Sequence, residues 1–223
     1  MPLIRLSNAK LIYFAHVPKC AGSTIERYLE TRFGSLGFLD RQYGAIDVAD
    51  RWSRTSPQHM PEQVRQRYLP DDFLDASFAI VRHPATRLRS VFLFQREIQG
   101  GIATDQKFES WLASLSNVNA SPFALDGHLR PMTDCVPEQA TVFALEAGLP
   151  SVIDWLDVMS GTTAPDVPLK PLNVLHRRLQ SENRAIPQVV LSQEALERVA
   201  ELYAADYARF EYDLRPPEQD TTE

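Results

Sequence analysis

Short, continuous apolar runs alternate along this chain with stretches whose apolar residues recur at helical spacing. Three runs have the length of buried strands, residues 11–15, 76–81 and 141–145. Helices are predicted at residues 23–33, 61–69, 86–99, 105–116 and 151–159, and from Ser192 onward. Continuous apolar runs are typical of parallel strands that are covered on both faces. The alternation of strands and helices therefore predicts an α/β domain with a mainly parallel sheet.

The length of the chain predicts a single domain. A sequence of 223 residues normally folds around one core. We expect this domain to span residues 1–215, and we expect the polar residues 216–223, which begin with two prolines, to form a disordered tail. The proline-rich segment 161–171 is predicted to be exposed.

Charge and cysteine content narrow the classes of function. The net charge is −6 at pH 7, which argues against general binding to nucleic acid, so an anionic ligand needs local groups of arginine and lysine. The two cysteines cannot form a disulfide framework, and no apolar run approaches the roughly eighteen residues of a membrane span. No signal peptide is visible. We therefore expect a cytoplasmic protein without a transmembrane segment.

The first candidate site is the turn after the first apolar run. Residues 16–25 read His-Val-Pro-Lys-Cys-Ala-Gly-Ser-Thr-Ile, so Lys19 and Gly22 stand just before a helix predicted to begin at Ser23. The first N–H groups of a helix lack intrahelical partners, and the helix dipole favours negative charge there. The turn therefore predicts an anion site. It is not a Walker A loop, because the lysine precedes the glycine and no matching Asp-bearing strand for Mg²⁺ is found.

A second candidate anion site follows the second apolar run. Arg82 stands at the end of this run, and Ser90 lies eight residues later in the predicted helix. The planar guanidinium of Arg82 suits a phosphate, and Ser90 adds a hydroxyl. Two such sites after neighbouring strands imply a ligand with two separated anionic groups. Arg87 and Arg89 are expected on a solvated face of the helix.

Both motifs resemble those of the sulfotransferases that use 3′-phosphoadenosine 5′-phosphosulfate (PAPS), with closer similarity to carbohydrate sulfotransferases and their bacterial relatives. Residues 127–131, Gly-His-Leu-Arg-Pro, are similar to the family's His-Trp-Arg-Pro segment, and residues 202–210 are similar to its closing Tyr-x-x-Asp-Tyr-x-x-Phe helix. The resemblance implies a P-loop-like three-layer fold with a central, mainly parallel sheet flanked by helices. It also implies PAPS as the sulfuryl donor, no metal, and a hydroxyl acceptor on a carbohydrate.

The resemblance assigns roles to individual residues. The residues implicated at the 5′-phosphosulfate are contiguous: Lys19, Cys20, Ala21, Gly22, Ser23 and Thr24. Arg82 and Ser90 are implicated at the 3′-phosphate, and His128 and Arg130 are expected to bind the acceptor. The chain departs from the family pattern at Cys20 (usually threonine), His83 (usually Asn or Asp) and Leu129 (usually tryptophan). The last departure removes an aromatic ring that would stack on a sugar.

The expected chemistry is sulfuryl transfer by in-line displacement. Like phosphoryl transfer, it depends on positioning and charge stabilisation, and Lys19 is expected to neutralise charge on the bridging oxygen as the bond to sulfur breaks. The acceptor hydroxyl needs a base with a pKa near neutral, which points to a histidine. Related sulfotransferases have a histidine proposed as the base in the neighbourhood of His59. His59 is therefore the expected base, with His128 as the alternative.

Two other functions remain open from the sequence. One is a P-loop-type nucleotide phosphotransferase, which would turn over ATP with magnesium. The other is a non-catalytic module on the same fold that binds a nucleotide or a sulfated glycan. The Tyr203, Tyr207 and Phe210 side chains are expected to pack in the core.

Overall fold

The computed structural model describes residues 1–217 apart from 120, 165–168, 170–171 and 173. The chain forms two compact units, Met1–Val81 with Met132–Pro171, and Arg82–Pro131 with Leu172–Glu223. Residues 218–223 of the predicted tail lie outside the described residues, as does most of 165–171 in the proline-rich segment. A single domain over residues 1–215 stays a prediction.

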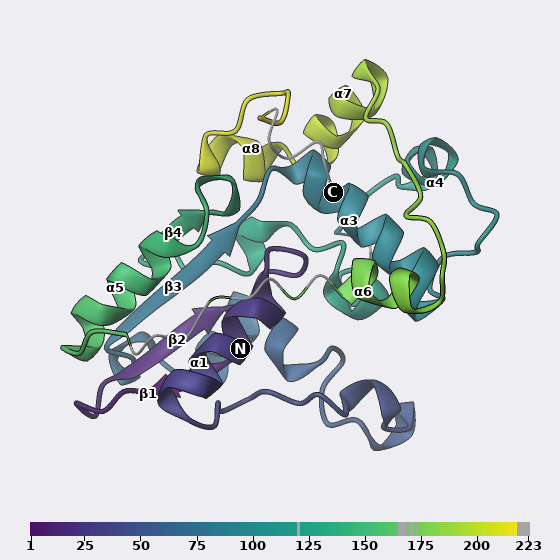
Figure 1. Cartoon of the computed structure of the whole chain (residues 1–223). Helices are drawn as coiled ribbons and strands as arrows, with labels where there is room; N and C mark the ends of the chain where they lie inside the picture. The colour runs from purple at the N-terminus through teal and green to yellow at the C-terminus, as the bar shows by residue number, and fades with distance from the viewer. Residues whose placement is uncertain (120, 165–168, 170–171, 173, 218–223) are drawn as a thin grey trace. The chain divides into compact units, whose positions relative to one another are not determined.

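The first unit is built on a four-stranded sheet in the order β1-β2-β3-β4 (Figure 1). The strands β2 (Leu11–Ala15), β3 (Ala76–Val81) and β4 (Thr141–Ala144) are parallel, and β1 (Leu3–Arg5) pairs with β2 in antiparallel orientation. The predicted α/β fold with a mainly parallel sheet is confirmed. The strand β1 is not predicted, because its three residues are too few to give a pattern.

Helices cover both faces of this sheet. On one face, Phe78 of β3 stacks on Phe14 of β2 at 4.8 Å between ring centroids and contacts Trp155 of α5 (Pro150–Ser160) at 5.1 Å. On the other face, Tyr13 lies beneath the guanidinium of Arg65, from α2 (Glu62–Tyr68), at 5.6 Å. Successive strand residues point to opposite faces of the sheet, so the side chains of Tyr13 and Phe14 lie on opposite faces.

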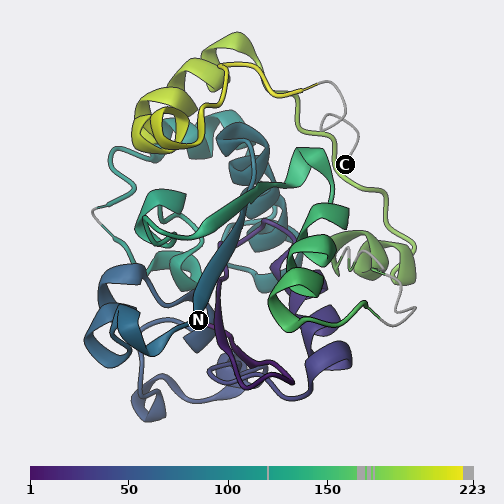
Figure 2. The same cartoon turned by 90° about the vertical axis from the view of Figure 1, so that its left-hand side faces the viewer.

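The helix that follows β2 shares its layer with α5 (Figure 2). This helix, α1 (Gly22–Phe33), ends at Gly34, as the sequence predicts. Its Arg32 forms an ion pair with Asp157 of α5 at 2.6 Å. The ion pair fixes the C-terminal end of α1. The position of its N-terminal end depends on the turn that precedes the helix.

The second unit is helical. It contains α3 (Pro84–Phe94), a π-helical turn (Gln95–Gln99), α4 (Phe108–Ser114), α6 (Val174–Ser181), α7 (Gln193–Leu202) and α8 (Ala204–Phe210). Its core is formed by apolar side chains of α3, α4 and α7, including Leu88, Phe92, Trp111 and Val199. Ser192 caps α7 by accepting a hydrogen bond from the Ala195 amide, as predicted.

Two predictions for the second unit are wrong, and one of its helices is not predicted. The helix expected over residues 86–99 is interrupted, because the backbone widens into a π turn at Gln95. The helix α6 is not predicted at all. Arg87 and Arg89, expected on a solvated face, are buried, and the Arg87 guanidinium is bonded to the carbonyls of His128 and Arg130.

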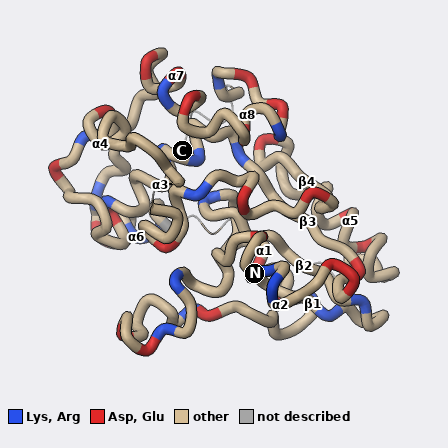
Figure 3. Tube along the Cα trace, turned by 180° about the vertical axis from the view of Figure 1, so that it is seen from behind, with Lys and Arg blue, Asp and Glu red and all other residues tan. Residues whose placement is uncertain are grey.

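Among the residues that the structure describes, no helix combines the length and the apolar character needed to cross a membrane. Lysine and arginine are scattered along the chain among acidic residues (Figure 3).

Candidate functional site

The turn between β2 and α1 has a strained backbone. Lys19 and Ala21 both adopt the left-handed conformation, with φ values of 67° and 59°. For a residue with a Cβ atom this conformation costs about 1–2 kcal/mol. Such strain persists only where the surrounding structure imposes it, and it clusters at ligand-binding sites. The sequence predicts the turn, but it does not predict that two residues other than glycine adopt the left-handed conformation in it.

The first amides of α1 precede the hydrogen bonds that the helix makes within itself. The Ala21 carbonyl accepts hydrogen bonds from the Thr24 amide at 3.0 Å and the Ile25 amide at 3.2 Å, so the helix satisfies its own donors from Thr24 onward. The amides of Gly22 and Ser23 precede that point. The Ser23 side chain is exposed, Lys19 is half-buried, and Thr24 and Cys20 are buried. The donors of this turn thus suit an anion.

His16 lies directly against Gly22. A Cβ atom at position 22 would stand 1.8 Å from the His16 Nε2 atom, so only glycine fits there. The other ring nitrogen, Nδ1, lies 2.6 Å from a carboxylate oxygen of Glu26 on the first turns of α1. The imidazole therefore connects the turn to the helix that follows it.

The His16–Glu26 pair is buried and carries one charge. Burial lowers the pKa of His16, an effect that the Glu26 carboxylate only partly opposes. Burial alone would raise the pKa of Glu26, but His16, His59 and the amino group of Met1 outweigh it, and that pKa is lowered. At neutral pH the pair is thus a neutral imidazole that donates its Nδ1–H to an ionised carboxylate.

His59 lies beside His16. It ends the short 3₁₀ turn Pro57–His59, and its ring meets the His16 ring edge-on with 4.9 Å between centroids. Its Nδ1 atom lies 3.0 Å from the Ser56 hydroxyl oxygen. Because His16 also touches Gly22, the first unit brings the predicted base into the neighbourhood of the predicted anion turn.

Arg82 follows the last residue of β3 and begins the second unit. Its side chain is 2% exposed, and its Nε–H donates to the Thr86 hydroxyl at 3.1 Å. Ser90 is partly exposed on α3. The neighbouring His83 caps this helix, because its Nδ1 accepts a hydrogen bond from the Ala85 amide at 3.2 Å. Histidine thus performs the capping role for which Asn and Asp are suited.

Arg87 holds the segment that contains His128 and Arg130. Its guanidinium donates to the His128 carbonyl at 3.2 Å and to the Arg130 carbonyl at 2.9 Å. It also lies over the ring of Tyr203, whose hydroxyl donates to the Leu129 carbonyl at 2.9 Å. This role is not predicted from the sequence, although Arg87 belongs to the motif that carries the family resemblance. Core packing is the prediction for Tyr203, which is buried.

The side chains of the 127–131 segment are largely buried. His128 is 4% exposed, and the Arg130 guanidinium donates to the Pro122 carbonyl at 2.6 Å and lies over the Phe123 ring. Leu129 belongs to the apolar core of the second unit. Position 129 is therefore a core position in this chain, and a side chain there would not face a sugar.

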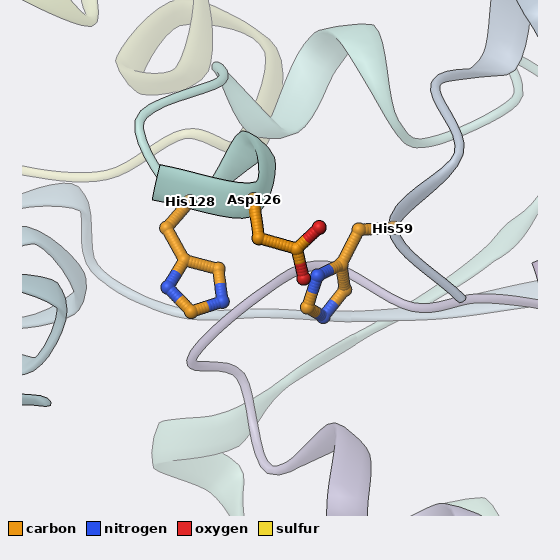
Figure 4. A group of neighbouring side chains, drawn as sticks. All are labelled: His59, Asp126 and His128. Atoms are coloured by element: carbon orange, nitrogen blue, oxygen red, sulfur yellow. The ribbon is translucent and has the colours of Figure 1, made fainter. Parts of the chain in front are cut away.

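The turn that precedes His128 is also strained. Leu125 and Asp126 adopt left-handed backbone conformations with φ values of 51° and 57°. Figure 4 shows the Asp126 and His128 side chains leaving the same side of this turn. The second unit thus places Asp126, which is not among the predicted site residues, beside one that is.

The predicted residues fall into two groups. The first unit assembles the Lys19–Thr24 turn with His59, and the second contains Arg82, Ser90, His128 and Arg130. A sequence profile described as the sulfotransferase family matches residues 3–213 and so includes both groups. Comparisons with curated proteins and with solved structures gave no match.

Replacing Gly22 with alanine is expected to destabilise the protein, because the new methyl group would overlap His16. We expect the free energy of unfolding to fall by about 1–3 kcal/mol, as for other overpacked sites. Gly44→Ala is the matched control, because nothing lies within 4 Å of the added Cβ atom. Chemical denaturation measures both. Equal stability of the two variants would contradict the packing of His16 against Gly22.

The His16–Glu26 pair is expected to make stability depend on pH. Both pKa values are lower in the folded chain, so the unfolded chain binds more protons, and stability is lost as the pH falls below the ordinary His value of 6.5. The double variant His16→Gln/Glu26→Gln removes both titrations. Its unfolding midpoint in urea should fall less than that of the wild type between about pH 7.5 and pH 5.5. His176→Gln should behave like the wild type, and a double variant as sensitive as the wild type would contradict the assignment.

Proposed function

Because the chain belongs to the sulfotransferase family, we propose that it transfers a sulfuryl group from PAPS to a hydroxyl of a carbohydrate. The observation that carries the proposal is the strained turn at Lys19, which combines a lysine with the first amides of a helix after a parallel strand. Ligands of α/β sheets bind outside the carboxyl ends of parallel strands. A cytoplasmic location remains part of the proposal.

The chain's donors match the two anionic groups of PAPS. The 5′-phosphosulfate is assigned to one contiguous set, Lys19, Cys20, Ala21, Gly22, Ser23 and Thr24, which offers an ammonium group, amides and hydroxyls. The 3′-phosphate is assigned to Arg82 and Ser90. The two motifs follow β2 and β3, which are parallel neighbours in the sheet. No carboxylate belongs to either set, so the donor set suits an anion rather than a cation.

His59 is the proposed general base. If its Nδ1–H donates to Ser56, its Nε2 atom is an acceptor and can take the proton of the acceptor hydroxyl. The hydroxyl oxygen then forms a bond to sulfur while the bond between sulfur and the bridging phosphate oxygen breaks. Lys19 neutralises the charge that develops on that oxygen, and adenosine 3′,5′-bisphosphate leaves.

A carbohydrate acceptor is compatible with the absence of tryptophan at position 129. The Leu129 side chain packs in the apolar core, so its replacement of tryptophan removes no exposed stacking surface. His128 and Arg130 are proposed to contact the acceptor. Arg87 and Tyr203 act through the backbone of this segment and are positioning residues.

Lys19→Ala and Arg82→Ala are each expected to weaken binding of adenosine 3′,5′-bisphosphate. A hydrogen bond to a charged group contributes about 1.5–3 kcal/mol, so the dissociation constant should rise at least about tenfold. Calorimetric titration measures it. The exposed residues Lys107 and Arg67 provide control variants, Lys107→Ala and Arg67→Ala, that remove the same charges elsewhere. If the controls weakened binding as much as the site variants, the assignment of the two motifs would be wrong.

His59→Ala is expected to spare binding of the nucleotide and to lower transfer of sulfate by about 10²–10⁴-fold, the usual effect of losing a general base. The assay follows labelled sulfate from PAPS onto a panel of polysaccharides. His176→Ala, on α6, is the control. Transfer at the wild-type rate by His59→Ala would remove His59 as the base.

A further inference from the structure

The π-helical turn after α3 places Gln95 against His128. A π turn inserts one extra residue into a helix, and such turns are frequent at functional sites. Here it begins at Gln95, whose side chain is 2% exposed. The Gln95 side-chain nitrogen lies 2.8 Å from the Nδ1 atom of His128. Both side chains are buried, so whichever group donates in this contact determines which His128 nitrogen carries the proton.

The Leu125 carbonyl indicates which way the Gln95 amide points. The same amide nitrogen lies 2.6 Å from the Gln99 side-chain oxygen and 3.5 Å from the Leu125 carbonyl, a group that can only accept. The amide oxygen lies on the other side, against Gly101, where a Cβ atom would stand 2.4 Å from it. The nitrogen therefore faces a set of acceptors, and His128 Nδ1 is one of them.

An imidazole that accepts at Nδ1 carries its proton at Nε2 while it is neutral. An Asp126 carboxylate oxygen and an imidazole nitrogen of His128 lie within 4.8 Å of one another. The charged groups near His128 act in opposite directions. Asp126 favours an imidazolium, whereas the guanidinium of Arg87, bonded to the His128 carbonyl, disfavours it.

We propose that Gln95 is a positioning residue that holds His128 as the neutral Nε2–H tautomer, so that His128 donates a hydrogen bond to an oxygen of the acceptor and does not act as the general base. Phe94 packs against the ring with 5.6 Å between centroids, and Arg87 holds the backbone, so the ring has little freedom to turn over. The role at the acceptor rests on the proposed function, but the tautomer does not.

Nitrogen NMR of the full chain with ¹⁵N-labelled histidine tests the tautomer without any substrate. We expect His128 to show an unprotonated Nδ1 and a protonated Nε2 at neutral pH, with the signals assigned by their loss in His128→Gln. Gln95→Glu replaces the donor with a carboxylate, which should move the proton to Nδ1. Gln180→Glu adds the same charge at an exposed position of α6 and should leave the signals unchanged.

The variant Gln95→Met covers the case in which Gln95→Glu does not fold, since it removes the donor without a charge and should yield a mixture of tautomers. A protonated Nδ1 in the neutral wild-type ring, or a His128 spectrum that neither Gln95 variant changes, would overturn the proposal. A protein with the expected tautomer that neither binds the bisphosphate nor transfers sulfate would disprove the proposed function and leave the tautomer assignment intact.

Discussion

The contact between His16 and Gly22 is the constraint on which the candidate site depends. The imidazole fills the space that a Cβ atom at position 22 would need, and its other nitrogen is bonded to Glu26 in α1. The turn is thereby fixed at its end and at the helix that follows, which explains how Lys19 and Ala21 can both hold left-handed backbone conformations. The turn directly follows strand β2, and the Arg32–Asp157 ion pair fixes the C-terminal end of α1.

The same contact organises the chemistry around the turn. The neutral His16 separates the Glu26 carboxylate from Gly22, so the helix amides and Lys19 determine the charge that the turn presents. The His59 ring contacts the same imidazole edge-on, so His16 packs against both the anion turn and the proposed base. In the second unit, Arg87 has a comparable place. Its hydrogen bonds connect the motif that begins at Arg82 to the backbone of residues 128–130. A displacement of α3 would therefore also displace the His128 backbone.

The sequence predicts the elements whose signals are local. Continuous apolar runs identify β2 and β3, and a glycine and a serine mark the end of α1 and the start of α7. What it does not predict depends on packing between distant residues. Arg87 is buried against backbone carbonyls that lie about forty residues away in the sequence, so its burial could not be predicted locally. A charged side chain taken alone indicates a solvated position. The π turn at Gln95 leaves no mark in the apolar period of α3, and the His16–Glu26 bond joins residues that the turn brings together.

The most direct test is calorimetric titration of the wild-type chain with adenosine 3′,5′-bisphosphate, with adenosine 5′-monophosphate, and with ATP in the presence of Mg²⁺. We expect the bisphosphate to bind at least about tenfold more tightly than the monophosphate, a difference of about 1.4 kcal/mol. This preference would show that two separated anion sites act on one nucleotide. The proposed function would be contradicted by equal affinity for the bisphosphate and the monophosphate, by no binding of the bisphosphate, or by a preference for ATP with Mg²⁺.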